Sequence, residues 1–285
     1  MGALLGYAAW MLTLTTVYLA VPGLSVAFLC LLAASAAGAI VVRVARCRPA
    51  QKAPWLLLAA AAFCFGGSRL TLLMGADRPP LPSWNAYTIV GLPTYALLAA
   101  ALGLFARARS SGPDRRSLVD AVTVSAGLVL LVWLFRILPT LTDPTLTGAQ
   151  KLASASYPLG QIAILLALAR LLAPGIVWDW PVRLVTIGTV CGLVSGVVFG
   201  LLRLQLVYWR LVDLGWICCF ALFAAAAMHP AMREMTRHAA RPYETSRARL
   251  VVLTLASFVA PLLLILQGHD EIGRASCRER VLMSV

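Results

Sequence analysis

The sequence is divided into runs of about 20 mostly apolar residues, and this division limits the fold more than any other feature. A helix needs about 20 apolar residues to cross the hydrocarbon core of a bilayer. Nine such runs lie between short segments rich in Pro, Gly and Arg: 2–20, 24–42, 54–74, 86–106, 118–138, 154–172, 182–203, 212–229 and 249–267. Because 61% of the residues are hydrophobic and 12% are charged, too few polar side chains remain to cover a water-exposed surface. The sequence therefore predicts an all-α, polytopic bundle of about nine transmembrane helices.

Basic residues are concentrated in alternate connections between these runs. They follow the second, fourth and eighth runs, at Arg43, Arg46, Arg48, Lys52, Arg107, Arg109, Arg115, Arg116, Arg233, Arg237, Arg241, Arg247 and Arg249. The intervening connections 21–23, 75–85 and 139–151 carry few basic residues. Because cytoplasmic loops are enriched in Lys and Arg, the N-terminus is predicted to be cytoplasmic. The formal charge of +13 is thereby explained by membrane topology, so the expected partner is the lipid bilayer and not nucleic acid.

Three consecutive pairs of runs have a common plan, which suggests repeated helical hairpins at about 54–106, 118–172 and 182–230. Arg69, Arg136 and Arg203 each lie near the outer end of a rising helix, at intervals of 67 and 67 residues. Asp77, Asp143 and Asp213 follow at intervals of 66 and 70 residues, in what are expected to be outer loops. A single ancestral hairpin would produce this spacing, and chance is the alternative explanation.

Arg69, Arg136 and Arg203 are the candidate ligand-binding residues. If the hairpins pack around a rotation axis, their three guanidinium groups would converge below the outer surface and could bind a small anionic ligand there. The alternative is that each side chain extends to the outer headgroups or pairs with a nearby Asp.

Glycine recurs at every fourth position of the seventh run, at Gly188, Gly192, Gly196 and Gly200. Small residues at this spacing form a flat face on which another helix can pack closely in lipid. We expect this face to pack within the chain, with a homodimer contact as the alternative.

The polar residues do not form a recognisable catalytic pattern. All eleven Asp and Glu residues lie in loops or near the ends of the predicted helices, which disfavours ion-driven transport. The three His residues are too far apart in sequence to predict a metal site, and no nucleotide-binding or hydrolase motif is present. The sequence thus predicts no cofactor, no metal and no catalytic residue, so the chain as given is not expected to be an enzyme.

From about residue 55 to 267 the chain resembles the multi-pass N-terminal membrane region of bacterial proteins that carry GGDEF, and often EAL, domains for turnover of cyclic di-GMP. The stretches that carry the resemblance are "WLLLAAAAFCFGG" at 55–67, "LPSWNAYTIVGLPTYALLAAALGLFAR" at 81–107, "RRSLVDAVTVSAGLVLLVWLFRILP" at 115–139, "SASYPLGQIAILLALARLL" at 154–172, "DLGWICCFALFAAAAMHPAMREMT" at 213–236 and "RARLVVLTLASFVAPLLLILQ" at 247–267. Similar proteins often have an acidic residue after the glycine of the third helix, where this chain has Ser68 and Arg69.

The resemblance implies that residues 1–267 form a membrane sensor and anchoring domain. In the family a further span precedes a cytoplasmic catalytic domain, and this chain contains no GGDEF or EAL signature. The parent protein is therefore expected to be a diguanylate cyclase or a cyclic-di-GMP phosphodiesterase whose catalytic half is absent from this chain. A stand-alone transporter or channel is the alternative.

Residues 268–285 are predicted to be a non-native or disordered tail. The stretch "IGRASCRERV" at 272–281 resembles the translation of a short-read sequencing adapter. It would also place basic residues on the outer face, against the charge rule that the rest of the chain follows. Residues from about 271 onward are accordingly assigned no function.

Overall fold

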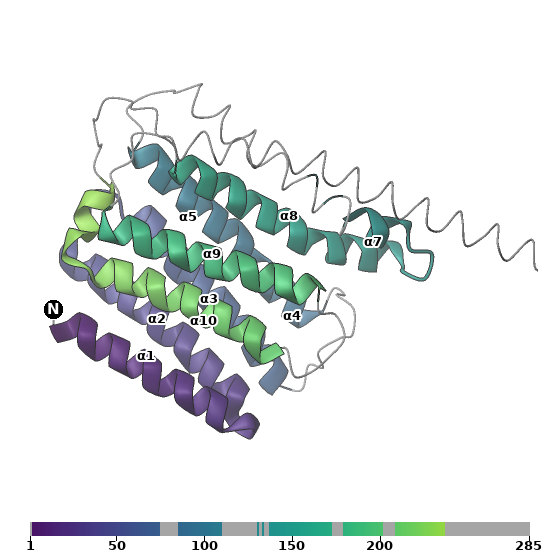
Figure 1. The fold of residues 1–285 in the computed structure, drawn as a ribbon, viewed down its shortest axis with the longest axis horizontal. Coiled ribbons are helices and arrows are strands. Elements are labelled where there is room, and N and C mark those ends of the chain that lie inside the picture. The colour runs from purple at the N-terminus through teal and green to yellow at the C-terminus, as the bar shows by residue number, and fades with distance from the viewer. Residues whose placement is uncertain are drawn as a thin grey trace, which may run out of the picture.

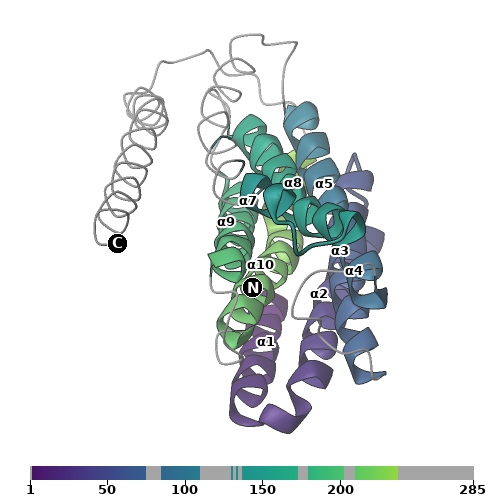
Figure 2. The ribbon, with the colours of Figure 1, turned by 90° about the vertical axis from the view of Figure 1, so that its right-hand side faces the viewer.

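A computed structural model of the chain describes residues 2–74, 85–109, 137–172, 179–201 and 209–236, together with Leu130 and Trp133. Every regular element in these residues is helical, with no strand among them. The long helices lie side by side and form a bundle elongated along their axes (Figures 1 and 2). This confirms the predicted all-α class for the described part of the chain.

The helices cover most of seven of the nine predicted runs. In chain order they are α1 (Gly2–Ala20), η1 (Pro22–Leu24), α2 (Ser25–Cys47), α3 (Ala53–Leu73), α4 (Ala86–Gly91), α5 (Pro93–Arg109), α7 (Leu138–Thr142), α8 (Gly148–Leu171), α9 (Trp180–Leu201), α10 (Trp209–Met228) and η4 (Pro230–Thr236). Most of the predicted run 118–138, and all of 249–267, lie outside the described residues.

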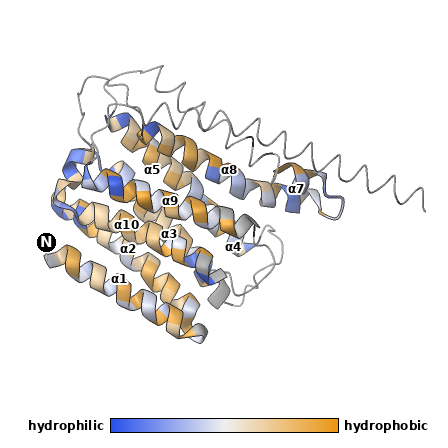
Figure 3. Cartoon of the chain, viewed as in Figure 1, coloured by the Kyte–Doolittle hydropathy of each residue, from blue (hydrophilic) through white to orange (hydrophobic). Residues whose placement is uncertain are grey.

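Five helical segments are long and apolar enough to cross a membrane: Gly2–Ala20, Ser25–Cys47, Ala53–Thr71, Ala86–Arg109 and Gly148–Leu171. Two shorter apolar segments, Trp180–Gly196 and Val212–Met228, belong to α9 and α10. Large apolar side chains face outward along the bundle, such as Leu12 (67% exposed) and Phe63 (71% exposed), where a soluble protein would place polar ones. Apolar residues cover most of the length of the helices in Figure 3. These features indicate a multi-pass helical membrane protein.

Two helix ends differ from the sequence-based boundaries. The second run is predicted to end at residue 42, but α2 continues to Cys47, so Arg43 and Arg46 are helical residues and not loop residues. The helix ends where Arg48 adopts a left-handed conformation (φ 44°), which is a common way to terminate a helix. The helix thus continues beyond its apolar part, and the basic side chains lie near its C-terminus, where the helix dipole is negative and favours positive charge.

The connection predicted over 139–151 is also partly helical. It contains α7, and α8 begins at Gly148, several residues before the predicted start at 154. The cause is a capping box at the start of α8. The Thr147 hydroxyl accepts a hydrogen bond from the Gln150 N–H at 3.3 Å, and the Gln150 side-chain oxygen accepts one from the Thr147 N–H at 3.0 Å.

The helices α9 and α10 pack closely against each other. The Ser195 hydroxyl donates a hydrogen bond to the Val212 carbonyl. A Cβ atom added at Gly215 would lie 2.6 Å from the Cβ of Ser195, so only glycine permits this approach. Beside this contact, the rings of Phe65 and Trp216 stack with their centroids 5.5 Å apart, which links α3 to α10 at the centre of the bundle.

Basic residues from different helices meet at one end of the bundle. There Arg43 donates to the Met228 carbonyl at 3.2 Å, and Arg233 donates to the Cys47 carbonyl at 2.8 Å. Arg109 at the end of α5 forms an ion pair with Asp179, just before α9, at 3.3 Å. The hydrophilic colour around η4 in Figure 3 marks this end. We call it the basic end; the turn between α1 and α2 lies at the opposite end (Figure 1).

Candidate functional site

A buried ion pair joins three helices near the end of the bundle opposite the basic end. Arg69, near the end of α3, contacts Asp213, in the second turn of α10, with Nη2 and Oδ1 2.8 Å apart. The Tyr18 hydroxyl of α1 donates to the other Asp213 oxygen at 3.0 Å. Exposed fractions of 3%, 2% and 1% show that Arg69, Asp213 and Tyr18 are all buried. Because removing one partner of such a pair leaves an uncompensated buried charge, each charged group depends on the other.

The guanidinium group of Arg69 is also enclosed by aromatic rings. Its Cζ atom lies 4.9 Å from the ring centroid of Phe65 and 5.2 Å from that of Tyr87. Cation–π contacts of this kind stabilise a desolvated cation. A hydrogen-bond acceptor can then approach the guanidinium group along the edge of its plane, where the N–H groups point.

Two nitrogen atoms on that edge lack an acceptor. Nε and Nη1 of Arg69 are buried and make no hydrogen bond within the described part of the chain. A buried donor without a partner costs about 1–3 kcal/mol, and more when it is charged. An incompletely bonded guanidinium at a cavity is therefore the strongest indication of a binding site in this bundle.

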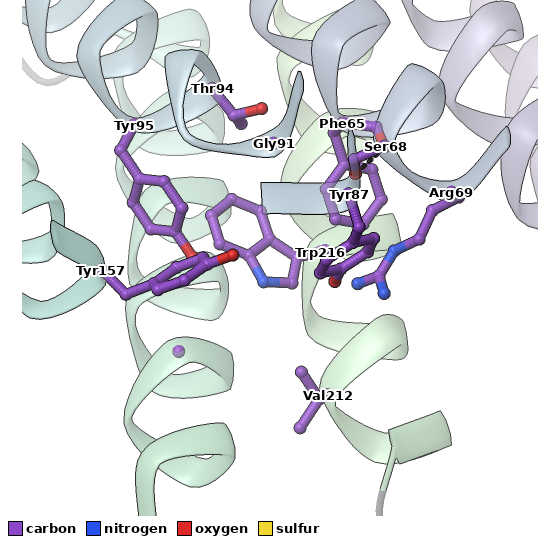
Figure 4. A pocket seen from close by; sticks show the side chains of 11 residues that line it. Phe65, Ser68, Arg69, Tyr87, Gly91, Thr94, Tyr95, Tyr157, Val212 and Trp216 are labelled. Atoms are coloured by element: carbon purple, nitrogen blue, oxygen red, sulfur yellow. Dashed lines mark hydrogen bonds between the residues drawn. The ribbon is translucent and has the colours of Figure 1, made fainter. Parts of the chain in front are cut away.

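The cavity beside Arg69 has a volume of about 40 Å³. Its walls come from six helices, α3, α4, α5, α8, α9 and α10, through Phe65, Ser68, Arg69, Tyr87, Gly91, Thr94, Tyr95, Tyr157, Gly196, Val212 and Trp216. Figure 4 shows the guanidinium of Arg69 beside Tyr87, with Trp216 between this group and the pair Tyr95 and Tyr157. A site built by six helices responds to changes in how those helices pack.

Aromatic contacts hold the cavity wall in place. The ring of Tyr95 meets that of Trp216 edge-on at 5.5 Å and that of Tyr157 edge-on at 5.8 Å. The Tyr157 hydroxyl donates to the hydroxyl of Thr88 at 3.3 Å, which connects α8 to α4. Asn85 caps α4 by accepting a hydrogen bond from the Thr88 N–H at 3.0 Å, so the segment that carries Tyr87 has a fixed start.

The site is suited to binding and not to proton transfer. Arg69 is the one side chain with a formal charge among the described residues that line the cavity, and arginine keeps its proton in proteins. Asp213 is engaged by Arg69 and Tyr18. The arrangement therefore presents hydrogen-bond donors to an acceptor group, between apolar and aromatic walls.

The three candidate arginines have different outcomes. Arg69 lines the cavity, whereas Arg136 and Arg203 lie outside the described residues, so their convergence with Arg69 stays a prediction. In the alternative interpretation each arginine pairs with a nearby Asp, and Arg69 does make such a pair. Asp213 lies near the start of α10, in agreement with its place near the start of the predicted run 212–229. Its assignment to an outer loop was wrong, because it is buried in the bundle and contacts Arg69 and Tyr18.

The glycine face of α9 is directed toward neighbouring helices in the same chain. A Cβ atom at Gly188 would lie 3.0 Å from the Cys219 carbonyl oxygen, and one at Gly192 would lie 3.2 Å from the Cys219 sulfur, both on α10. A Cβ atom at Gly196 would meet the Gln161 side chain of α8. The side-chain environment of Gly200 is outside what the structure describes.

Sequence reasoning missed the roles of Tyr18, Tyr95 and Trp216. Tyr18 lies in a predicted span, where its hydroxyl group requires a hydrogen-bond partner. This requirement was the one sign in the sequence that Tyr18 makes a polar contact inside the bundle. Nothing in the sequence pairs Tyr18 with Asp213, because 195 positions separate them. Tyr95 and Trp216 lie within apolar runs and have no local pattern that distinguishes a cavity wall from the ordinary core.

Comparison of the chain with known protein families, curated proteins and solved structures finds no match.

Proposed function

We propose that the chain is the membrane-embedded input and anchoring region of a bacterial protein that makes or degrades cyclic di-GMP. In this proposal nine helices span the inner membrane, the N-terminus is cytoplasmic, and a cytoplasmic catalytic domain belongs to the same protein beyond this chain. The resemblance of the stretches between residues 55 and 267 to the membrane regions of such proteins is the sequence-based support.

The structural observation that carries the proposal is the separation of two kinds of site along the bundle. The cavity at Arg69 lies toward one end of the helices, and the basic side chains of α2, α5 and η4 gather at the other. Basic residues favour the cytoplasmic side. The cavity would then be close to the outer face, where an input region meets a molecule from outside the cell.

Packing supports transmission between these ends. The cavity wall is shared by six helices, and α3 and α10 both contribute to it. The same α10 leads to η4 at the basic end, where Arg233 contacts the end of α2. A ligand that favours one arrangement of α3 against α10 therefore has a direct structural route to the cytoplasmic side.

A stand-alone transporter or channel is the second candidate, and the burial of Asp213 favours it. A buried carboxylate inside a membrane bundle is a common feature of ion pathways. Against this function, Asp213 lies in the second turn of α10 and is held by both Arg69 and Tyr18, so an ion would have to displace an existing pair.

The uninterrupted gene sequence downstream of codon 270, read from the source DNA, distinguishes the two functions. We expect it to encode one further span and then a GGDEF domain, with or without an EAL domain. A stop codon soon after the ninth span, without a nucleotide-turnover domain, would support the transporter and reject the signalling function.

A further inference from the structure

We infer that the Arg69 cavity is a binding site for a small monocarboxylate of about the size of acetate. The inference gives a ligand class to the input site, and its physiological meaning rests on the proposed function. The binding itself is a property of this chain and can be measured without the rest of the protein.

The donors at the cavity select the ligand's functional group. Arginine has five N–H groups, and those on Nε and Nη1 of Arg69 lack an acceptor within the described residues. Because Phe65 and Tyr87 contact the guanidinium group at 4.9 and 5.2 Å from their ring centroids, an acceptor is expected to approach in its plane. A carboxylate oxygen in the plane of a guanidinium forms a short, charge-assisted hydrogen bond.

The volume favours a small ligand. One water molecule needs at least about 10–15 Å³ of comparable space. A cavity of about 40 Å³ therefore holds roughly three waters, or a single molecule of about four heavy atoms. Acetate has four heavy atoms, with two oxygens for Arg69 and a methyl group for the apolar wall formed by residues such as Val212 and Trp216.

The burial of Arg69 distinguishes this cavity from a surface patch of basic residues. Its side chain is 4% exposed, so competition from bulk water and salt is weak. Arg69 is also held in position by Asp213 at 2.8 Å, which fixes the direction of its remaining N–H groups before a ligand arrives. A preorganised donor loses little conformational freedom on binding.

Saturation-transfer NMR on the purified chain in lipid nanodiscs tests the inference, with acetate and its uncharged isostere acetamide as probes. We expect a saturable signal from the protein to the acetate methyl group, absent from empty nanodiscs. Acetamide should bind at least about tenfold more weakly, because it carries no negative charge to attract the guanidinium group.

Two variants alter the cavity in different ways. Arg69→Lys keeps a positive charge opposite Asp213 but removes the fork of donors, and Val212→Leu adds one carbon to the cavity wall. We expect each to weaken acetate binding at least about tenfold. Val41→Leu is the matched control, because Val41 is 46% exposed on the outside of α2 and should leave binding unchanged.

Circular dichroism of each variant shows whether it is folded, and if Arg69→Lys is not, Val212→Leu carries the test alone. Equal binding of acetate and acetamide, equal acetate binding by Val212→Leu and Val41→Leu, or no acetate binding by the folded wild-type chain would overturn the inference. None of these results depends on cyclic-di-GMP turnover, so failure of the ligand assignment and failure of the signalling function are separate outcomes.

Discussion

Arg69 is a charged residue whose position depends on residues far away in the sequence. Its ion pair with Asp213 and the hydrogen bond from Tyr18 connect α3, α10 and α1. A complete buried ion pair gives about the same stability as apolar residues in its place. Removal of one partner lowers the stability strongly, because the other charge stays buried. The pair should therefore couple the stabilities of these helices.

We predict that Asp213→Asn and Arg69→Gln each lower the free energy of unfolding by about 3 kcal/mol, because each leaves a partner charge buried. The double variant should lose much less than the sum of the two, because neither charge then remains. Unfolding by a denaturing detergent, followed by circular dichroism, measures the three changes and gives the coupling energy.

Arg210→Gln is the control for this double-mutant cycle. Arg210 lies three residues before Asp213 on α10 but is partly exposed and donates to the Leu19 carbonyl at 3.3 Å. Its replacement should cost less than about 1 kcal/mol. Additive effects of Arg69→Gln and Asp213→Asn would show that the pair does not contribute to stability in the membrane.

Sequence reasoning identified Arg69 but could not identify its surroundings. A charged residue within an apolar run is conspicuous, so Arg69 was predictable as a candidate. Asp213 was assigned to an outer loop although it is the second residue of the predicted run 212–229, and a position near the end of a run does not show which helix face a residue occupies. The cavity depends on six helices meeting, which local patterns do not encode.

The contact between α9 and α10 illustrates how single elements are specified. The Cβ positions at Gly188, Gly192 and Gly215 all point toward atoms of the facing helix at 3.2 Å or less. In lipid, dense packing of this kind replaces the hydrophobic effect as the source of helix association. The glycines are therefore expected to matter because of the neighbouring helix, and not because of backbone flexibility.

We predict that Gly188→Ala destabilises the bundle by about 1–3 kcal/mol, because the added methyl group would lie 3.0 Å from the Cys219 carbonyl oxygen and 3.1 Å from the Phe223 ring. Gly103→Ala on α5 is the matched control, since nothing lies within 4 Å of its Cβ position. It should be neutral or slightly stabilising, as alanine favours helix more than glycine.

The same detergent unfolding assay compares the two alanine variants, and single-molecule photobleaching in nanodiscs measures their oligomeric state. Equal stability of Gly188→Ala and Gly103→Ala, together with loss of a dimer in Gly188→Ala, would contradict the intrachain packing and favour the homodimer contact.

The apolar runs predicted the positions of the helices more accurately than the positions of the helix ends. Helices cover most of seven runs because length and hydropathy are local properties. The ends differ where polar residues extend a helix, as with Arg46 in the last turn of α2 and the Thr147 capping box before α8. A hydropathy scale assigns such polar residues to loops, although their side chains or charges stabilise a helix end.

At the scale of the whole molecule, the bundle has two chemically different ends. Hydrogen bonds and an ion pair from Arg43, Arg109 and Arg233 connect helix ends at the basic end. The turn at η1 and the Arg69 cavity lie toward the other. In the proposed function, the positive-inside rule orients the bundle with its basic end toward the cytoplasm.

We predict that a cysteine at position 23 is labelled by a membrane-impermeant maleimide in intact cells, whereas one at position 52 is labelled only after lysis. Gly23 and Lys52 are both exposed and lie in the connections on either side of α2. The variants Gly23→Cys and Lys52→Cys are made in a chain whose seven cysteines are replaced by serine or alanine. The reverse labelling pattern would contradict the proposed orientation.

The central claim, that this bundle is the input region of a cyclic-di-GMP signalling protein, is tested most directly by nucleotide turnover. The product of the full gene, read from the source DNA, is placed in membrane vesicles. Synthesis from GTP and hydrolysis of cyclic di-GMP are then measured for the wild type, Arg69→Lys and Val41→Leu. We predict turnover by the wild type, a rate changed several-fold by Arg69→Lys, and no change with Val41→Leu. No turnover by the folded, intact product, or identical rates for all three proteins, would contradict the account.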